Sequence, residues 1–352
     1  MRTLLGAVAA SLVLVPLTAM SAGAAHVGAD SLHWQTSTVG SDQELRGLAP
    51  VSARTAWVSG DRGGVFRTTD GGATWADVSP PEGADLLFRD VEATDATHAL
   101  VLAIGPGDAS RIYRTTDAGS TWTATFVNDD PDAFFDCMAM WPGGRTGLAM
   151  SDPVDGKFRI IRTTDSGRTW SVVDPAGMPP AADGEFGFAA SGTCLATAGG
   201  RDAWLVSGGA ASRVFHSADG GHTWTVTDST VPASEAGGTF SVSFRNPRQG
   251  LVVGGDYLVP DNGADASAYS RDAGRRWTNG GDVGGYRSGV DWVSGSPHAA
   301  IAVGTSGSDL TTDGGRSWTG FDTDGYDAVQ CLPGGVCWAS GSHGRVGWLR
   351  AR

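Results

Sequence analysis

The hydrophobic and polar residues of this chain form short strand-like runs, and turns rich in glycine separate the runs. Strand-like segments cover residues 45–51, 56–59 and 65–67, and a fourth covers residues 76–78. An eight-residue turn sequence lies between the last two segments. Because the same order recurs along the chain, the pattern predicts a repeat of four β-strands.

The turn sequence occurs six times and reads Thr-Thr-Asp-Gly-Gly-Ala-Thr-Trp at residues 68–75. An Asp-x-Gly turn suits a β-hairpin, because the carboxylate accepts backbone N–H groups and glycine adopts positive φ. We therefore expect its aspartates to stabilise hairpins, and the tryptophan that follows to pack between repeats. The six aspartates, at intervals averaging about 49 residues, are Asp70, Asp117, Asp165, Asp219, Asp272 and Asp313.

Four strands in about 49 residues are typical of a propeller blade. Six turn sequences give six blades, and residues 326–350 supply three more strands without a turn sequence. Residues 31–39 resemble the Trp-led strand that follows each turn sequence, so we expect this N-terminal strand to complete the last blade and close the ring. We predict one all-β domain, a seven-bladed β-propeller over residues 26–352. The expected blades cover residues 45–78, 86–126, 133–173, 186–227, 238–279, 285–321, and 326–350 together with 31–39.

The first 25 residues have the pattern of a signal peptide. A short positive start is followed by an uncharged apolar run over residues 4–17 and by small residues at 21–25 that suit cleavage. The apolar run is too short to span a bilayer comfortably, although an uncleaved anchor is the alternative. We expect a secreted or extracytoplasmic protein without stable membrane insertion.

Export makes disulfides an expectation for the four cysteines. Cys331 and Cys337 flank a turn-rich pentapeptide, which favours a local hairpin disulfide. Cys137 and Cys194 occupy the same relative place in consecutive repeats, so a bridge between neighbouring blades is plausible. The cysteines lack C-x-x-C spacing, which disfavours a metal site.

Charge and motifs exclude several classes of function. The formal net charge of −13 argues against a nucleic-acid backbone or an anionic membrane as the main partner. The sequence has no G-x-S-x-G, H-E-x-x-H or P-loop, and its one G-x-G lacks the third glycine of a dinucleotide site. The acidic segments 128–132 and 261–265 do not fit the calcium-loop spacing. We expect no cofactor, no metal and a monomer.

The turn sequence is the Asp-box, and the chain resembles the BNR/Asp-box propeller superfamily over essentially its whole mature length. That superfamily includes sialidases, other glycoside hydrolases, sortilin-type receptors and photosystem II stability/assembly factor-like proteins. The last group is the most similar, in blade size and in the order of strand, glycine-rich turn and box. In such propellers the box lies on outer hairpins away from the channel mouth. The resemblance therefore implies that the box aspartates are structural and that function lies on the opposite face.

The face opposite the boxes carries the entries into the innermost strands and the loops between the second and third strands of each blade. Arg46, Arg89 and Arg287, from separate blades, are expected to bind a carboxylate or an acidic segment through forked donors. The alternative is that they form ordinary salt bridges with neighbours such as Asp90 and Asp136. The candidate ligand-binding residues are Arg46, Arg89, Asp90, Asp136, Asp152, Glu185, Asp256, Tyr257, Arg287, Ser306, Asp309 and His343. Two insertions, 174–188 and 256–268, fall on the same face, where long loops often carry binding.

We expect a non-catalytic binding or assembly scaffold that presents this face to a protein segment or a small acidic ligand. The alternative is a glycoside hydrolase or a sialidase-like glycan-binding propeller. Hydrolysis requires two carboxylates at a suitable separation, drawn from the acidic candidates, and an aromatic platform such as Tyr257 or Tyr286. The sialidase F-R-I-P segment is absent, and the similar residues 158–161 are better explained as a strand.

Overall fold

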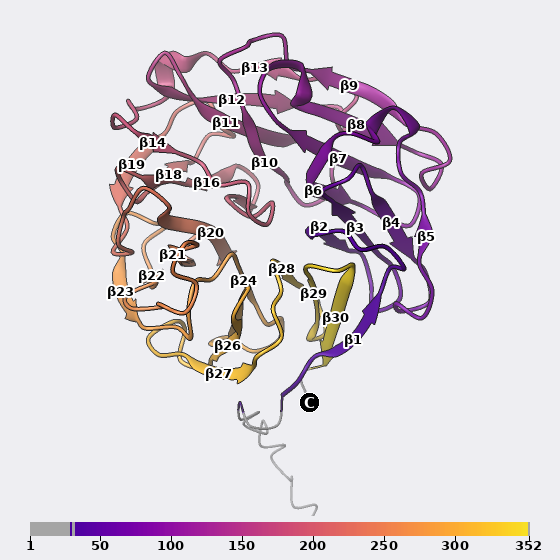
Figure 1. Cartoon of the computed structure of the whole chain (residues 1–352). Coiled ribbons are helices and arrows are strands. Elements are labelled where there is room, and N and C mark those ends of the chain that lie inside the picture. Colours follow the sequence, from indigo (N-terminus) through magenta and orange to yellow (C-terminus); the bar gives the residue numbers. More distant parts are fainter. Residues whose placement is uncertain (1–28, 30–31, 351–352) are drawn as a thin grey trace, which may run out of the picture.

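The computed structural model describes residue 29 and residues 32–350, which form an all-β ring of seven sheets (Figure 1). Each sheet is one blade of a propeller, and its antiparallel strands follow one another from the central channel to the rim. The predicted seven-bladed propeller is confirmed. The predicted signal peptide lies outside the described residues. None of the helices in the described part of the protein is long and apolar enough to cross a membrane.

Seven sets of strands make up the blades, each given from the channel outward. Blade 1 consists of β2 (Leu45–Pro50), β3 (Ala56–Gly60), β4 (Val65–Thr68) and β5 (Ala76–Asp77). Blade 2 consists of β6 (Leu87–Ala93), β7 (Ala99–Ile104), β8 (Arg111–Thr115) and β9 (Thr123–Val127). Blade 3 consists of β10 (Phe135–Met140), β11 (Gly147–Val154), β12 (Lys157–Thr163) and β13 (Ser171–Val172). Blade 4 consists of β15 (Leu195–Ala198), β16 (Asp202–Val206), β18 (Arg213–Ser217) and β19 (Thr225–Asp228).

The remaining blades follow the same order. Blade 5 consists of β20 (Gly237–Asn246), β21 (Gln249–Asp256), β22 (Ser267–Ser270) and β23 (Thr278–Gly281), with the short β14 (Glu185–Phe186) and β17 (Gly208–Gly209) added beyond β20. Blade 6 consists of β24 (Gly289–Trp292), β25 (Ala300–Gly304), β26 (Gly307–Thr311) and β27 (Thr319–Asp322). Blade 7 consists of β28 (Ala328–Cys331), β29 (Val336–Ser340), β30 (Arg345–Arg350) and β1 (Gln35–Thr38). Short 3₁₀ helices in the connections are η2 (Pro81–Gly83), η3 (Gly107–Ala109) and η4 (Pro175–Gly177).

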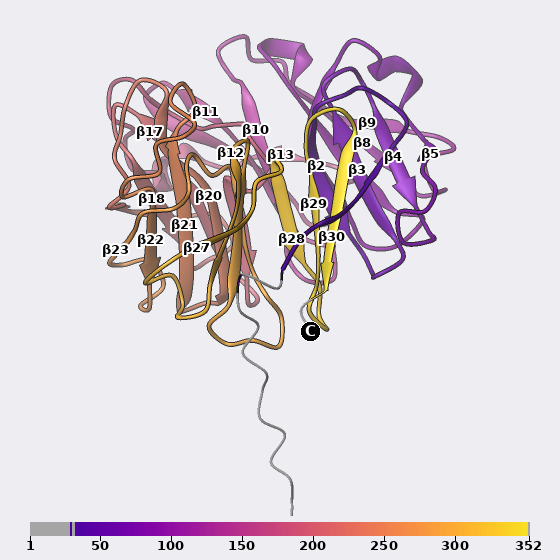
Figure 2. The same cartoon turned by 60° about the horizontal axis from the view of Figure 1, so that its bottom comes forward.

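The N-terminal strand closes the ring, as the sequence predicted. β1 pairs antiparallel with β30, from Gln35 opposite Trp348 to Thr38 opposite Arg345. Trp34 precedes this strand and is buried, and its indole Nε1 donates to Ser308 Oγ of blade 6 at 2.9 Å. In Figure 2, β28 to β30 of blade 7 stand next to β2 of blade 1, with which β28 and β29 are in contact. The first and last described segments are therefore held together.

The predicted hairpin aspartates each organise a turn between the third and fourth strands. Asp70 Oδ1 accepts the Thr68 hydroxyl at 2.8 Å and the Thr74 N–H at 2.9 Å. Asp70 Oδ2 accepts the Thr74 hydroxyl at 2.6 Å. These bonds, led by those from Thr74, lower the pKa of Asp70 to about 2. The turn needs Gly72, whose φ of 85° is a conformation that side chains disfavour.

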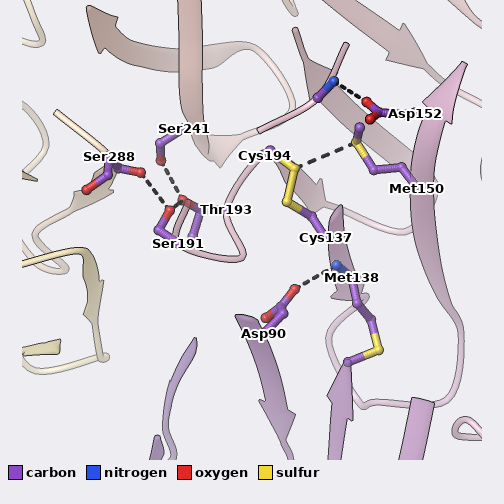
Figure 3. Close-up of a disulfide and its surroundings, with 11 residues drawn as sticks. Asp90, Cys137, Met138, Met150, Asp152, Ser191, Thr193, Cys194, Ser241 and Ser288 are labelled. Atoms are coloured by element: carbon purple, nitrogen blue, oxygen red, sulfur yellow. Dashed lines mark hydrogen bonds between the residues drawn. A yellow bond between two sulfur atoms is a disulfide. The ribbon is translucent and has the colours of Figure 1, made fainter. Parts of the chain in front are cut away.

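Both predicted disulfides are present. Cys137 of β10 is bonded to Cys194, which leads into β15, so the bridge joins blades 3 and 4 (Figure 3). Cys331 and Cys337 lie directly opposite each other in β28 and β29. Such bonds persist in oxidising compartments, so they agree with an extracytoplasmic location.

Candidate functional site

A β-bulge recurs at the same place in the innermost strand of four blades. The register shifts between Leu45 and Gly47 in β2, and equivalent shifts occur in β6, β10 and β20. A bulge re-aims the extra residue, and bulges are frequent at functional sites. The extra residues are Arg46, Arg89, Asp136 and Phe240. Two predicted arginines and one predicted carboxylate therefore occupy equivalent positions beside the channel.

Arg46 and Arg89 share one carboxylate. Arg46 Nη2 lies 2.6 Å from Glu44 Oε1, and Arg89 Nη1 lies 3.7 Å from Glu44 Oε2. Arg46 is also 3.9 Å from Asp327 Oδ1. We call these four residues the channel mouth: Glu44, Arg46, Arg89 and Asp327.

The channel mouth holds unused hydrogen-bond donors. The arginine side chains are only 20% and 17% exposed. Within the described residues, Nε of Arg46 and Nε of Arg89 are buried without a hydrogen-bond partner. Burial and the charge of Arg46 lower the pKa of Arg89, and burial raises the pKa of Asp327 to about 6. The mouth therefore combines two close cations with two carboxylates, and the bonds among these four groups leave the Nε–H of both arginines unused.

Arg287 does not join the other two arginines. It is 2% exposed, and its Nε donates to Asp309 Oδ2 at 2.6 Å. Its Nη1 donates to Ser306 Oγ at 3.1 Å, and that hydroxyl in turn donates to the carbonyl of Pro260 at 3.0 Å. The buried pair Arg287 and Asp309, together with the partly exposed Ser306, thus supports the loop that follows β21.

One segment extends from blade 4 into the centre of the ring. We call residues 187–193, between β14 and β15, the channel plug. Its hydrogen bonds reach four other blades. The Gly187 N–H donates to Asp152 Oδ1 of blade 3 (2.7 Å), and the Ala190 carbonyl accepts Arg46 Nη1 of blade 1 (3.3 Å). Ser191 Oγ donates to the Ser288 carbonyl at the start of blade 6 (2.6 Å), and Thr193 Oγ1 is bonded with Ser241 Oγ of blade 5 (2.7 Å). Figure 3 shows Ser191 and Thr193 facing Ser288 and Ser241. The plug therefore ties the mouth to the body of the ring.

Four carboxyl groups with raised pKa values lie in two pairs, and one member of each pair, Asp90 or Asp136, is buried against the plug. Burial, together with the charge of its neighbour, raises the pKa of Asp136 beside Asp152 and that of Asp90 beside Glu92. Burial raises the pKa of Asp152 to about 6 and that of Glu92 to about 7. Asp136 is only 2% exposed, and Gly187 of the plug lies against it. The Asp136–Asp152 pair is thus covered rather than open to a substrate.

The other predicted residues have structural contacts. Glu185 is buried against Arg213 and Ser207. Asp256 accepts the Ser234 hydroxyl at 2.6 Å. His343 is exposed and pairs with Asp42 at 2.6 Å.

Of the two acidic segments, 128–132 is tied by Asp130, which pairs with Arg159 at 2.6 Å. In segment 261–265, Asp265 accepts the Asn279 amide at 2.8 Å. Both acidic segments thus have partners within the protein.

Tyr257 differs from these residues because it is 49% exposed. It is the first residue of the loop between β21 and β22. Its ring lies edge-on to Phe188 of the plug, with centroids 6.2 Å apart. Tyr257 therefore belongs to the same face as the channel mouth and remains available for contact.

Glu44 is the residue of the channel mouth that sequence reasoning missed. Its position two residues before Arg46 is the only signal in the sequence. The bulge at Arg46 and the approach of Arg89 from the next blade are tertiary features that no local pattern contains.

No protein-family model and no curated protein matches the sequence. The structure is similar to YCF48 bound to a D1 peptide, with a TM-score of 0.64 and 14% identity over 91% of this chain and 97% of that chain. It is also similar to YCF48 from Cyanidioschyzon merolae, with a TM-score of 0.60 and 16% identity over 90% and 98% of the two chains. The GH74 enzyme of Niastella koreensis gives a TM-score of 0.59 and 15% identity over 89% of this chain, which spans only 53% of that enzyme. At these identities the likeness shows the propeller fold, shared with the photosystem II assembly factor that the repeats resemble.

Proposed function

We propose that this protein is an exported, non-catalytic scaffold that binds an acidic segment of another extracytoplasmic protein at the channel mouth. The observation that carries the proposal is the pair Arg46 and Arg89, which share Glu44 and each keep a buried Nε–H without a partner among the described residues. A carboxylate accepts two parallel N–H bonds from a guanidinium, so an acidic side chain or the C-terminal carboxylate of a polypeptide matches the partly exposed guanidinium groups of these arginines.

Rigidity supports the same proposal. The mouth is held by strands of blades 1, 2 and 7 and by the plug, so its arginines are positioned before any ligand arrives. A preorganised site loses little conformational entropy on binding, which favours affinity from few contacts. YCF48, which has the same fold, has been solved with a bound peptide.

Side-chain contacts at the mouth are better supported than addition of a strand to the inner edges. Backbone N–H groups on three inner strands already donate to side chains of the preceding blade: Met138 to Asp90 (2.6 Å), Val290 to Ser241 (3.0 Å) and Cys331 to Asp291 (2.7 Å). A peptide that paired with these edges would have to displace those bonds.

Hydrolysis of a glycan has less support. The neighbouring carboxyl groups of Asp136 and Asp152 are the arrangement that such a reaction would use, but Asp136 is buried beneath Gly187. An acid and a base on a sugar must both reach the glycosidic bond, so the plug would have to move away first. Binding of an acidic segment at the channel mouth needs no such movement of the plug.

The proposal is tested by capture of partners. Immobilised protein is offered the exported and envelope fractions of its own cells, and bound proteins are identified by mass spectrometry. We expect Arg46→Gln/Arg89→Gln to lose a partner that the wild type holds. The matched control is Arg201→Gln/Arg248→Gln, which removes two exposed arginines from turns on the box face. If the Arg46→Gln/Arg89→Gln variant holds the partner as well as the control variant does, the assignment of the channel mouth as the binding site is overturned.

A further inference from the structure

An apolar cluster is exposed on the same face as the channel mouth. Six large apolar side chains are prominently exposed in the part of the protein that the structure describes, and three of them are consecutive. These are Tyr257, Leu258 and Val259, which are 49%, 72% and 52% exposed. Isolated exposed apolar residues are ordinary, whereas a contiguous group marks an interaction surface. We call residues 257–259 the apolar tip.

The exposure of the apolar tip is built into the fold. The Leu258 N–H donates to Asp256 Oδ1 at 2.9 Å, and the Val259 N–H donates to the Asp256 carbonyl at 3.1 Å. Asp256 is itself held by Ser234 at 2.6 Å. The backbone thus fixes the three side chains outward, so that their exposure does not follow from a loose loop.

The far side of this loop is anchored as well. The Pro260 carbonyl accepts the Tyr286 N–H at 2.8 Å and the Ser306 hydroxyl at 3.0 Å. Ser306 also receives Arg287, whose charge is compensated by Asp309. A buried ion pair therefore supports the apolar tip, which explains why Arg287 is not at the mouth.

A row of aromatic rings connects the apolar tip with the mouth. The centroids of Tyr257 and Phe240 are 6.3 Å apart, and those of Phe240 and Tyr286 are 4.8 Å apart. Phe188 of the plug stacks on Phe240 at 3.9 Å. Arg46 of the mouth reaches the plug as well, through the Ala190 carbonyl at 3.3 Å. The tip and the mouth thus both contact the plug, Tyr257 through Phe188 and Arg46 through Ala190, with buried rings packed beneath them.

We propose that the apolar tip and the channel mouth together bind one extended protein segment, which carries an acidic group for Arg46 and Arg89 and an aliphatic side chain for Leu258 and Val259. This inference rests on the proposed function and specifies its partner. An extended segment spans about 3.3 Å per residue, so two recognised groups about three to five residues apart bridge a gap of about 10–17 Å. Opposite charge fixes one end of the segment and apolar burial fixes the other.

The test uses three fluorescein-labelled nine-residue peptides in a Gly/Ser background. The first has leucine four residues before a C-terminal aspartate, the second has serine in place of the leucine, and the third has asparagine amide in place of the aspartate. Binding to the purified protein is measured by fluorescence anisotropy. We expect the first peptide to bind about tenfold more tightly than either of the others.

Variants assign the two halves of the site. Leu258→Ser/Val259→Ser is expected to abolish the preference for leucine over serine, and Arg46→Gln/Arg89→Gln to abolish the preference for the aspartate. The control is Val172→Ser, which changes a side chain that is 56% exposed on the outer strand of blade 3 and should keep both preferences. Because the apolar side chains replaced are exposed and glutamine keeps a hydrogen-bonding group at each partly exposed arginine position, the melting temperatures should change by only a few degrees, which shows that the variants are folded.

The outcomes separate this inference from the proposed function. If the wild type binds the leucine and serine peptides equally, or if Leu258→Ser/Val259→Ser keeps the leucine preference, the apolar tip has no part in binding and only this inference is overturned. If replacing the aspartate does not change the affinity of the wild type, or if Arg46→Gln/Arg89→Gln binds the peptide as tightly as the wild type, the channel mouth is not a binding site. The proposed function then fails too.

Discussion

At the scale of single residues, the same side chain has different roles according to its burial. Arg287 and Asp309 are both about 2% exposed and pair with each other, whereas Arg46 is 20% exposed and keeps an unused donor. Losing one partner of a buried pair leaves an uncompensated charge, which costs about 3–5 kcal/mol, and losing a partly exposed pair costs about 1 kcal/mol or less.

We therefore predict that Arg287→Met lowers the free energy of unfolding by about 3–5 kcal/mol and that Arg46→Gln lowers it by about 1 kcal/mol or less. Chemical denaturation followed by tryptophan fluorescence measures both. Peptide binding should show the reverse order. It should be strongly weakened in Arg46→Gln and less weakened in Arg287→Met, provided that Arg287→Met is assayed well below its melting temperature. Similar losses of stability in the two variants would contradict the conclusion that Arg287 is structural and that Arg46 belongs to the binding site.

The buried carboxyl groups make stability depend on pH. Asp152 and Glu92 have folded-state pKa values of about 6 and about 7, above the ordinary range near 4 of an unfolded polypeptide. A group whose folded pKa is raised stabilises the fold below its unfolded pKa, and this contribution disappears as the pH rises through the folded pKa. The box aspartates, such as Asp70 with a pKa of about 2, act in the opposite sense and only in strong acid.

The resulting prediction is a melting temperature that falls as the pH rises from about 4 to about 7, between the unfolded and folded pKa values, and then levels off. Asp152→Asn should flatten this dependence, because the amide has no proton to lose and its NH₂ can replace the protonated carboxyl. Scanning calorimetry at unit pH steps measures the effect, with Asp155→Asn, an exposed position in the same hairpin, as the control. A slope that Asp152→Asn leaves unchanged would show that other groups control it.

At the scale of elements, the two disulfides differ in the length of polypeptide that they close. Cys137 and Cys194 are 57 residues apart in sequence and join two blades, whereas Cys331 and Cys337 are six apart within one hairpin. Restricting a longer loop removes more entropy from the unfolded state. We predict that Cys137→Ala/Cys194→Ala loses about 2–4 kcal/mol of stability and Cys331→Ala/Cys337→Ala clearly less. Thermal unfolding of both variants decides this, and an equal loss would contradict it.

Elements that have local sequence signals were predictable, whereas the candidate site was predictable only in part. The hairpin around Asp70 is fixed by residues within eight positions of one another, so its pattern is complete in the sequence. The channel mouth instead depends on a bulge that re-aims Arg46, on Glu44 reaching the next blade, and on a plug that arrives from blade 4. Such long-range contacts leave no periodic trace, and for this reason Arg287 could not be separated from the other arginines.

At the scale of the whole molecule, the proposed function depends on a closed ring. Arg46 and Arg89 belong to blades 1 and 2, and Asp327 begins blade 7, so the geometry of the mouth depends on the junction between the first and last blades. β1 secures that junction by pairing with β30, and Trp34 extends the contact to blade 6. Without β1, β30 would be an unprotected edge strand, which is prone to pair with other molecules.

We therefore predict that a protein beginning at Gly40 is less stable than one beginning at Ala29, by roughly 10 °C or more in melting temperature, and that it associates as its concentration rises. Light scattering and thermal unfolding of the two proteins measure these effects. The shorter protein should also bind the leucine and aspartate peptide more weakly, although it keeps every residue of the mouth and of the apolar tip, because the blades that carry Arg46 and Asp327 are no longer held together. A monomeric short form with unchanged affinity would show that the inner strands hold the mouth without β1. In that case the N-terminal strand would serve only to cover an edge, and the rigidity of the site would come from contacts between blades and from the plug.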